Sequence, residues 1–188
     1  VVVTPELCLT GYTCGDLFLQ QALLDSAREE LLRIAQETAA LDIILLVGLP
    51  VAVKERLCNC AAVLCHGRIL GIVPKTHIPN YAEFYEKRHF SPGNGTSDLT
   101  IGGQEVPFGT DLLFECTTLP HFVLGVEICE DLWVPVPPSC AAAQSGATLI
   151  ANLSASDETI AKANYRHTLL RSQSARLEPA QQLQRAGL

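Results

Sequence analysis

The sequence of 188 residues contains no methionine, one tryptophan, and only 13 lysines and arginines against 20 aspartates and glutamates. The formal charge of -7 argues against nucleic-acid binding, because phosphate recognition needs a basic surface. The longest apolar run, Ile43 to Leu49, has the length of a strand and not of a membrane span. No basic-then-apolar leader is present. These absences predict a cytoplasmic protein that binds neither nucleic acid nor membrane.

The sequence also lacks the usual patterns for nucleotide and metal binding. Neither G-x-x-x-x-G-K-[ST] nor a G-x-G-x-x-G after a strand occurs. Cys58, Cys60, Cys65 and His66 form a cluster, but alternation along a strand places Cys65 opposite the first two cysteines. We therefore predict that these cysteines pack in the core, that all 8 cysteines are reduced, and that the chain binds no metal or cofactor.

What the sequence does contain is a strand and helix pattern typical of one α/β domain. Hydrophobic residues make up 48% of it and charged residues 18%, enough for a real core. Because helices cover only one side of so apolar a sheet, we expect the other side to pack on a second sheet, giving an α-β-β-α sandwich. Strands are predicted at 1–4, 43–49, 58–65, 68–73, 112–116, 122–128 and 147–153, and helices at 20–40, 139–145 and 157–177.

Three further segments have weaker patterns. Tyr81 to Phe90 is aromatic and charged and predicts a helical turn. The stretch from Ser91 to Thr110 is rich in glycine and polar residues and predicts a loop. Asp157 is a suitable cap for the last helix, which should end near Leu177.

Reactive side chains follow three of the predicted strands. Glu6 comes after the first strand, Lys75 after the second strand of a hairpin, and Cys129 after Val123 to Ile128. Alone, each is an ordinary strand-end residue, and Cys129 an ordinary core cysteine. Together they can converge on one edge of the sheets, where a cysteine at a sharp turn is exposed to a substrate carbonyl.

This set of residues suits the hydrolysis of an amide. Cys129 would attack the carbonyl carbon as a thiolate, and Glu6, if burial raises its pKa, would take the thiol proton. Lys75 and the backbone N–H of Glu130 would stabilise the negative oxygen of the intermediate. A second carboxylate, for which Glu86 is the leading candidate, would keep the lysine charged and aimed.

The motifs around these residues resemble those of the nitrilase, or carbon-nitrogen hydrolase, superfamily, whose members use a Glu-Lys-Cys triad. They are PELCLTGY around Glu6, VPKTHIPNY around Lys75 and GVEICEDLW around Cys129. Three more segments are similar to the glutaminase domain of glutamine-dependent NAD synthetases, namely NYAEFYEKRHFSPG from Asn80, CGDLF from Cys14 and NLSAS from Asn152.

The resemblance implies a nitrilase-like sandwich that hydrolyses glutamine to glutamate and ammonia through a thioester intermediate. It assigns the base to Glu6, oxyanion stabilisation to Lys75, the nucleophile to Cys129 and a fourth role to Glu86. It also implies a glutamine pocket lined by Tyr12, Tyr81, Glu130, Trp133 and Ser156. From the residues alone, the tyrosines are equally well half-buried aromatics, and Trp133 a core anchor.

The sequence departs from the family pattern at both ends. The first strand of the family is missing, and the resemblance stops after Leu177. We therefore expect an incomplete glutaminase domain at 1–177, truncated at both ends, and a divergent tail at 178–188. No SGGxDS-like loop of a synthetase domain occurs, so ATP and Mg²⁺ are expected only in an absent synthetase domain, which would receive the ammonia.

Unpaired sheet edges left by such a truncation favour a homo-oligomer. Two alternatives remain open at the sequence level. One is a nitrilase-like amidase that acts on another small amide. The other is a non-catalytic fragment that only associates with a partner.

Overall fold

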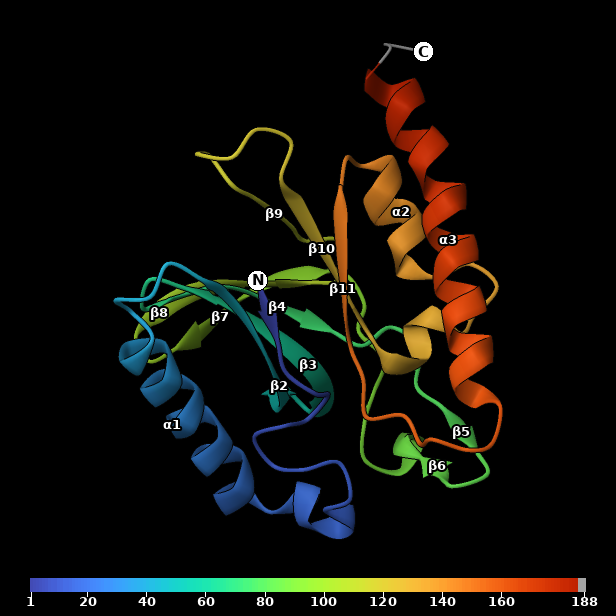
Figure 1. Cartoon of the computed structure of the whole chain (residues 1–188). Coiled ribbons are helices and arrows are strands. Elements are labelled where there is room, and N and C mark those ends of the chain that lie inside the picture. Colours follow the sequence, from blue (N-terminus) through green and yellow to red (C-terminus); the bar gives the residue numbers. More distant parts are fainter. Residues whose placement is uncertain (186–188) are drawn as a thin grey trace.

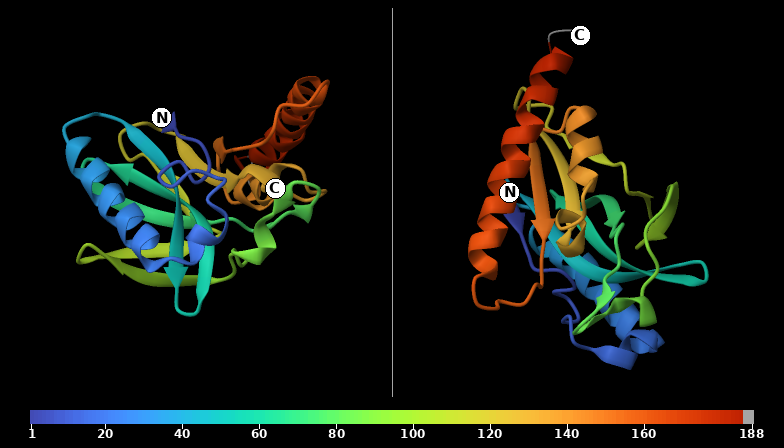
Figure 2. Two further views of the ribbon diagram at one scale, coloured as in Figure 1. Left: turned by 90° about the horizontal axis from the view of Figure 1, so that it is seen from below. Right: turned by 90° about the vertical axis from the view of Figure 1, so that its right-hand side faces the viewer.

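The chain folds into four layers, which succeed one another as helix, sheet, sheet and helices (Figure 1, Figure 2). The computed structural model describes residues 1–185, with side chains as far as Leu177. A six-stranded sheet carries α1 (Gln21–Glu37) on its outer face, and a three-stranded sheet carries α2 (Pro138–Gln144) and α3 (Lys162–Arg185) on the other. This is the α-β-β-α order predicted from the sequence.

The larger sheet has the strand order β1-β2-β3-β4-β8-β7. Strand β3 is antiparallel to both of its neighbours, β2 and β4, whereas β1 is parallel to β2 and β8 is parallel to β4. Helix α1 buries Ala27, Leu31 and Ala35, which recur at helical spacing along one side. The strands are β1 (Val2–Val3), β2 (Ile44–Val53), β3 (Arg56–Cys65), β4 (Arg68–Pro74), β7 (Thr96–Ile101) and β8 (Gln104–Gly109).

The smaller sheet has the order β11-β10-β9, and β10 (Val123–Ile128) lies in its centre. This strand is parallel to β11 (Leu149–Leu153) and antiparallel to β9 (Leu113–Glu115). The two sheets enclose a common apolar core, in which each fully buried aliphatic side chain contributes roughly 1.5–3 kcal/mol. This core contains Leu46, Ala61, Val63, Val73, Leu124, Val126, Ile128, Ala151 and Leu153.

The predicted loop at 91–110 is wrong, because most of it forms the hairpin β7–β8 at the edge of the larger sheet. Gly102 and Gly103 both have positive φ, as a tight turn requires. Ile101, Val106 and Phe108 point into the core beneath α1, whereas Glu105 and Pro107 are exposed. An edge strand with one polar face has few apolar residues, so the glycine and polar content of this segment indicated a loop.

Two other expectations differ from the structure. Tyr81 to Phe90 contains a small hairpin of β5 (Asn80–Tyr81) and β6 (Phe84–Tyr85), and a 3₁₀ turn only at η2 (Glu86–Arg88). Asp157 does not cap the last helix, which begins at Lys162; the two side chains form an ion pair instead. The helix also continues past Leu177 to Arg185, so residues 178–185 of the predicted tail extend it, and the remainder of the tail and its side chains lie outside the described residues.

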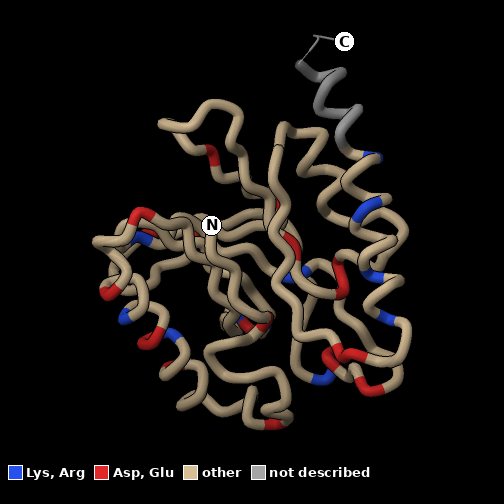
Figure 3. Tube along the Cα trace, viewed as in Figure 1, with Lys and Arg blue, Asp and Glu red and all other residues tan. Residues whose placement is uncertain are grey.

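Charged residues lie mainly on the outer helices and the loops (Figure 3). On α1, acidic and basic side chains alternate and form ion pairs, including Arg28 with Asp25 at 3.0 Å and Arg33 with Glu37 at 2.9 Å. Such exposed pairs contribute less than about 1 kcal/mol each. Within the described part of the chain, no helix combines the length and apolarity needed to cross a membrane.

Candidate active site

The four residues predicted to be catalytic lie in one cluster between the two sheets. Glu6 lies in the turn after β1, Lys75 directly after β4, Glu86 at the start of η2, and Cys129 at the start of η3 (Cys129–Leu132), directly after β10. All four are buried, with 1–7% of each residue exposed. Burial at a place where separate elements end is typical of a functional site and not of an ordinary apolar core.

Lys75 is the centre of this cluster. Its ammonium nitrogen Nζ donates hydrogen bonds to Oε1 of Glu6 at 2.6 Å and to Oε1 of Glu86 at 2.7 Å. Burial alone would lower the pKa of Lys75, but the charges of the two carboxylates outweigh it and raise that pKa. The lysine is therefore charged at neutral pH, and its position is fixed from two sides.

Glu6 is a buried acid with a raised pKa. Burial, with a contribution from the Glu86 charge, raises its pKa above the ordinary value of 4.5, although Lys75 and the Asn59 amide oppose the rise. A carboxylate with a raised pKa accepts and returns protons more readily near neutrality.

Cys129 has a strained backbone, with φ of +45°. This left-handed conformation is unfavourable for a residue with a side chain, so it persists only where the surroundings enforce it. Burial raises the pKa of the thiol to about 11, and the negative charge of Glu6 adds to the rise while Lys75 opposes it. The resting thiol is therefore protonated, and its reaction as a nucleophile requires a base.

Asp131 joins the backbone segments that carry Cys129 and Lys75. Its carboxylate accepts N–H hydrogen bonds from Ile128 at 3.1 Å, from His77 at 2.7 Å and from Thr76 at 3.2 Å. The ring nitrogen Nδ1 of His77 lies 3.0 Å from the same carboxylate, so His77 contacts it through both its backbone and its side chain. Ile128 directly precedes Cys129, and Thr76 directly follows the lysine, so one side chain positions both.

We predict that Asp131→Asn weakens this connection, because an amide NH₂ group cannot accept the N–H bonds that one carboxylate oxygen receives. Leaving a buried N–H unpaired costs about 1–3 kcal/mol. We expect Asp131→Asn to unfold at a lower urea concentration. We also expect it to lower kcat for amide hydrolysis more than it changes KM. Asp25→Asn is a suitable control, because this partly exposed carboxylate pairs with Arg28 on the outer helix α1. Equal effects of the two substitutions would contradict the assignment.

Two further residues contact the cluster in ways that the sequence did not predict. Asn59 of β3 was not predicted, yet its side-chain nitrogen Nδ2 donates to Glu6 at 2.7 Å and to Glu86 at 3.4 Å. Tyr12, expected in the substrate pocket, donates its hydroxyl to Oε1 of Glu86 at 2.6 Å. Burial and this bond to a carboxylate raise the pKa of Tyr12, so it remains a donor.

Of the other predicted pocket residues, Tyr81 and Glu130 form a pair. The Tyr81 hydroxyl donates to the Glu130 carboxylate at 2.9 Å, and burial together with this bond raises the tyrosine pKa to about 12. Both line an open hollow of about 530 Å³, which also borders the loop that follows Lys75. None of the four clustered residues lines this hollow, but Thr76 and Glu130, which directly follow Lys75 and Cys129, do.

Trp133 and Ser156 occupy other places around the cluster. Trp133 stacks on Tyr165 of α3, with ring centroids 5.6 Å apart and planes inclined by 27°. The backbone N–H of Ser156 donates to Oγ of Ser154 at 3.3 Å, and that hydroxyl in turn donates to Sγ of Cys129 at 3.5 Å. Ser156 is thus connected to the cysteine through one intervening side chain.

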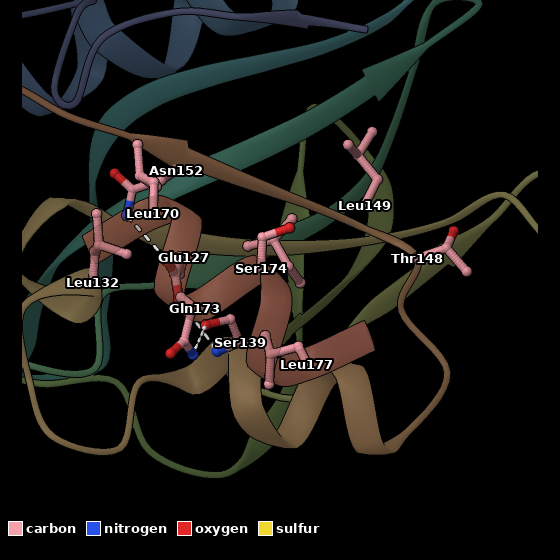
Figure 4. A pocket seen from close by; sticks show the side chains of 11 residues that line it. Glu127, Leu132, Ser139, Thr148, Leu149, Asn152, Leu170, Gln173, Ser174 and Leu177 are labelled. Atoms are coloured by element: carbon pink, nitrogen blue, oxygen red, sulfur yellow. Dashed lines mark hydrogen bonds between the residues drawn. The ribbon is translucent and has the colours of Figure 1, made fainter. Parts of the chain in front are cut away.

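A separate cavity of about 390 Å³ lies on the outer face of the smaller sheet, against α3 (Figure 4). Its buried acid, Glu127, has a pKa raised by burial. Both carboxylate oxygens are bound, one by the amide of Asn152 at 3.3 Å and the other by the backbone N–H of Ser139 at 3.2 Å. Glu127 therefore anchors α2 to the sheet, and none of the four clustered residues lines this cavity.

The other seven cysteines lie outside the cluster. All eight are free, and Cys58 and Cys60 are buried in the core beneath α1, as predicted, whereas Cys65 at the end of β3 is only partly buried. No group of three or more His, Cys, Asp or Glu side chains suited to a metal ion occurs among the described residues.

Residues 1–179 match the model of the family described as carbon-nitrogen hydrolase. The chain belongs to the carbon-nitrogen hydrolase family. It is 50% identical over 177 residues to the glutamine-dependent NAD(+) synthetase of Mycobacterium tuberculosis, which corresponds to 94% of this chain and 26% of that protein. The carbon-nitrogen hydrolase chain thus spans about a quarter of the length of the curated relatives it matches.

Solved structures show the same fold. The glutamine-dependent NAD(+) synthetase of Cytophaga hutchinsonii matches with a TM-score of 0.80 and 32% identity, covering 93% of this chain and 28% of that one. An amidase from Nesterenkonia sp. matches with a TM-score of 0.65 and 25% identity, covering 91% of this chain and 57% of that one. The nitrilase-like sandwich predicted for this carbon-nitrogen hydrolase is thereby confirmed.

Proposed function

We propose that this chain is a glutaminase that releases ammonia from the side-chain amide of glutamine through a thioester on Cys129. One observation carries the proposal, namely the buried Lys75 ammonium held between Glu6 and Glu86 within electrostatic reach of the strained cysteine. Burying two acids around one lysine costs free energy of folding, and such buried charge clusters are concentrated at functional sites.

In the first half of the proposed reaction, Glu6 takes the proton from the thiol of Cys129 as Sγ attacks the amide carbon. The carbonyl oxygen becomes negative and is stabilised by Lys75 Nζ and by the backbone N–H of Glu130. As the carbon–nitrogen bond breaks, Glu6 passes its proton to the leaving nitrogen, which departs as ammonia. The products are a glutamyl thioester and an ionised Glu6.

In the second half, Glu6 takes a proton from a water molecule, whose oxygen attacks the thioester carbon. The same two donors stabilise the second oxyanion. The carbon–sulfur bond then breaks, the thiolate of Cys129 recovers the proton from Glu6, and glutamate leaves. Glu86 does not exchange protons in this scheme; its charge keeps Lys75 ionised and in place.

The proposed glutamine site lies beside the pair of Tyr81 and Glu130. A carboxylate at the edge of the hollow suits the α-ammonium group of glutamine. Tyr12, Trp133 and Ser156 complete the proposed pocket around the cluster. This arrangement would select an amide that carries a positive group at a fixed distance from the carbonyl.

The relatives' names suggest where the ammonia goes. They are described as glutamine-dependent NAD(+) synthetases, and this chain covers about a quarter of them. We therefore propose that the ammonia passes to a synthetase domain, and that ATP and Mg²⁺ serve that domain and not amide hydrolysis. Val2 on the edge strand β1 and Leu149 on the edge strand β11 are exposed apolar residues, which favours association into a homo-oligomer.

A substrate panel tests this function against its nearest alternative, an amidase for another small amide, which the match to the Nesterenkonia enzyme favours. We expect ammonia release from glutamine to exceed release from propionamide or from N-acetylglutamine by at least about 100-fold in kcat/KM. A site built to pair the α-amino group discriminates by this much or more.

The Cys129→Ala variant provides the background rate in each case. Comparable rates on all amides would replace the glutaminase assignment with the amidase. Rates equal to the background on every amide, from a folded wild-type sample, would indicate a non-catalytic chain that only binds a partner.

A further inference from the structure

Asn59 is the residue of the cluster whose presence the fold does not explain. It lies in the middle of β3, is fully buried, and its Oδ1 has no hydrogen-bond partner among the described residues. Its neighbours Cys58 and Cys60 point to the other face, into the core beneath α1. A buried amide with an unpaired oxygen is less stable than an apolar side chain of the same size. The advantage of Asn59 must therefore lie in its NH₂ group.

That NH₂ group makes the two oxygens of Glu6 unequal. Oε1 accepts two short hydrogen bonds, from Lys75 Nζ at 2.6 Å and from Asn59 Nδ2 at 2.7 Å. Oε2 accepts one long hydrogen bond, from the backbone N–H of Ala155 at 3.3 Å. Two strong donors fill the acceptor directions of Oε1, whereas Oε2 retains a free lone pair.

We propose that Asn59 is a positioning residue that, together with Lys75, occupies Oε1 of Glu6 and leaves Oε2 to take the proton of Cys129. The proposal rests on the proposed function, which it deepens by naming the reacting atom. Asn59 also reaches Oε2 of Glu86 at 3.4 Å, so the two carboxylates are bridged twice, by the lysine and by the amide. With the lysine alone, Glu6 can rotate about its last bond and present either oxygen.

The charged and titratable groups around Glu6 determine what loss of Asn59 changes. Lys75 faces it from the end of β4, Glu86 from η2, Cys129 from η3, and Tyr12 from the loop after β1. A leucine at position 59 leaves all of these groups in place and removes only the neutral donor. Because that donor favours the ionised carboxylate, the pKa of Glu6 then rises further.

The test follows the pH dependence of iodoacetamide alkylation at Cys129, measured by peptide mass spectrometry on the full chain. This reaction needs the thiol proton to be removed but needs no glutamine turnover. In the wild type, we expect the rate to rise with pH through a step that belongs to Glu6, well below the thiol pKa of about 11. Glu6→Gln should remove that step and leave only the alkaline one.

In Asn59→Leu, we expect the Glu6 step to move upward by about one pH unit, the size expected for a hydrogen bond to a charged group. We also expect the rate above the step to fall at least about fivefold, because Oε2 is no longer held toward the thiol. Asn59→Ala serves as a second variant if leucine disturbs the fold. Cys60→Ala is the matched control, since it removes a buried side chain from the same strand on the opposite face.

Three results would overturn the proposal. They are a wild type without a Glu6-dependent step, an Asn59 variant with an unchanged step and rate, and a Cys60→Ala variant that shifts equally. The proposed function fails separately. If glutamine is not hydrolysed and yet Asn59→Leu shifts the alkylation step, the positioning of Glu6 holds and the substrate assignment is wrong.

Discussion

Replacing Lys75 with methionine is expected to abolish ammonia release and to lower the free energy of unfolding by about 3–5 kcal/mol. The lysine side chain is 0% exposed, and its removal leaves Glu6 and Glu86 facing each other without a cation. One of the two acids must then take up a proton, because two buried carboxylates do not both remain ionised. Urea unfolding and an ammonia assay measure the two effects.

A second substitution separates stability from chemistry. Adding Glu86→Gln to Lys75→Met removes one of the two facing carboxylates, so we expect part of the lost stability to return. Activity should stay absent, because no cation is left to stabilise the oxyanion. Lys54→Met is the control for loss of a positive charge, since Lys54 is exposed at the turn between β2 and β3. Measurable hydrolysis by Lys75→Met would contradict the role given to the lysine.

Replacing Cys129 with alanine is expected to reduce ammonia release by more than about 10³-fold, the scale seen when an enzyme loses its nucleophile. The substitution removes only the sulfur, so the network of Lys75, Glu6 and Glu86 should remain. Binding of glutamine should persist and is measurable by calorimetry. Loss of activity together with loss of binding would indicate damage to the pocket and not to the chemistry.

The strain at this position gives a control for stability. Cys129 has φ of +45°, a conformation that glycine adopts without steric cost. Cys129→Gly should therefore be at least as stable as Cys129→Ala, in spite of its more flexible unfolded state. A glycine variant markedly less stable than the alanine variant would show that the strain is absent in solution.

The fold was predictable where apolar runs are long. Strands such as β2, β3 and β10 are nearly unbroken apolar segments, and α1 shows regular helical spacing, so their type and order follow from the sequence. The hairpin β7–β8 was missed because its strands bury only one face. Asp157 is a residue type that often caps helices, but its carboxylate forms an ion pair with Lys162 instead of capping α3. A local capping preference is a weak guide where another local contact, here to a side chain five residues away, competes.

The site was predictable in part for a similar reason. Glu6, Lys75 and Cys129 each follow a strand, and polar residues just beyond apolar runs are visible in the sequence. Asn59 lies inside such a run, and its carboxylate partners are 53 and 27 residues away. The residues next to it in the sequence do not show which groups it contacts. Its signal is an amide flanked by apolar residues in a central strand, which needs a buried partner.

Intact-protein mass spectrometry of the wild-type chain, quenched with acid during turnover of glutamine, tests the central claim most directly. The account predicts a species heavier by one glutamyl group, located on the peptide that contains Cys129 and absent from Cys129→Ala. A variant in which Glu6 is replaced by glutamine should show little of it, because the thiol proton is not removed. Steady release of ammonia without any such adduct, or an adduct on another cysteine, would contradict the account.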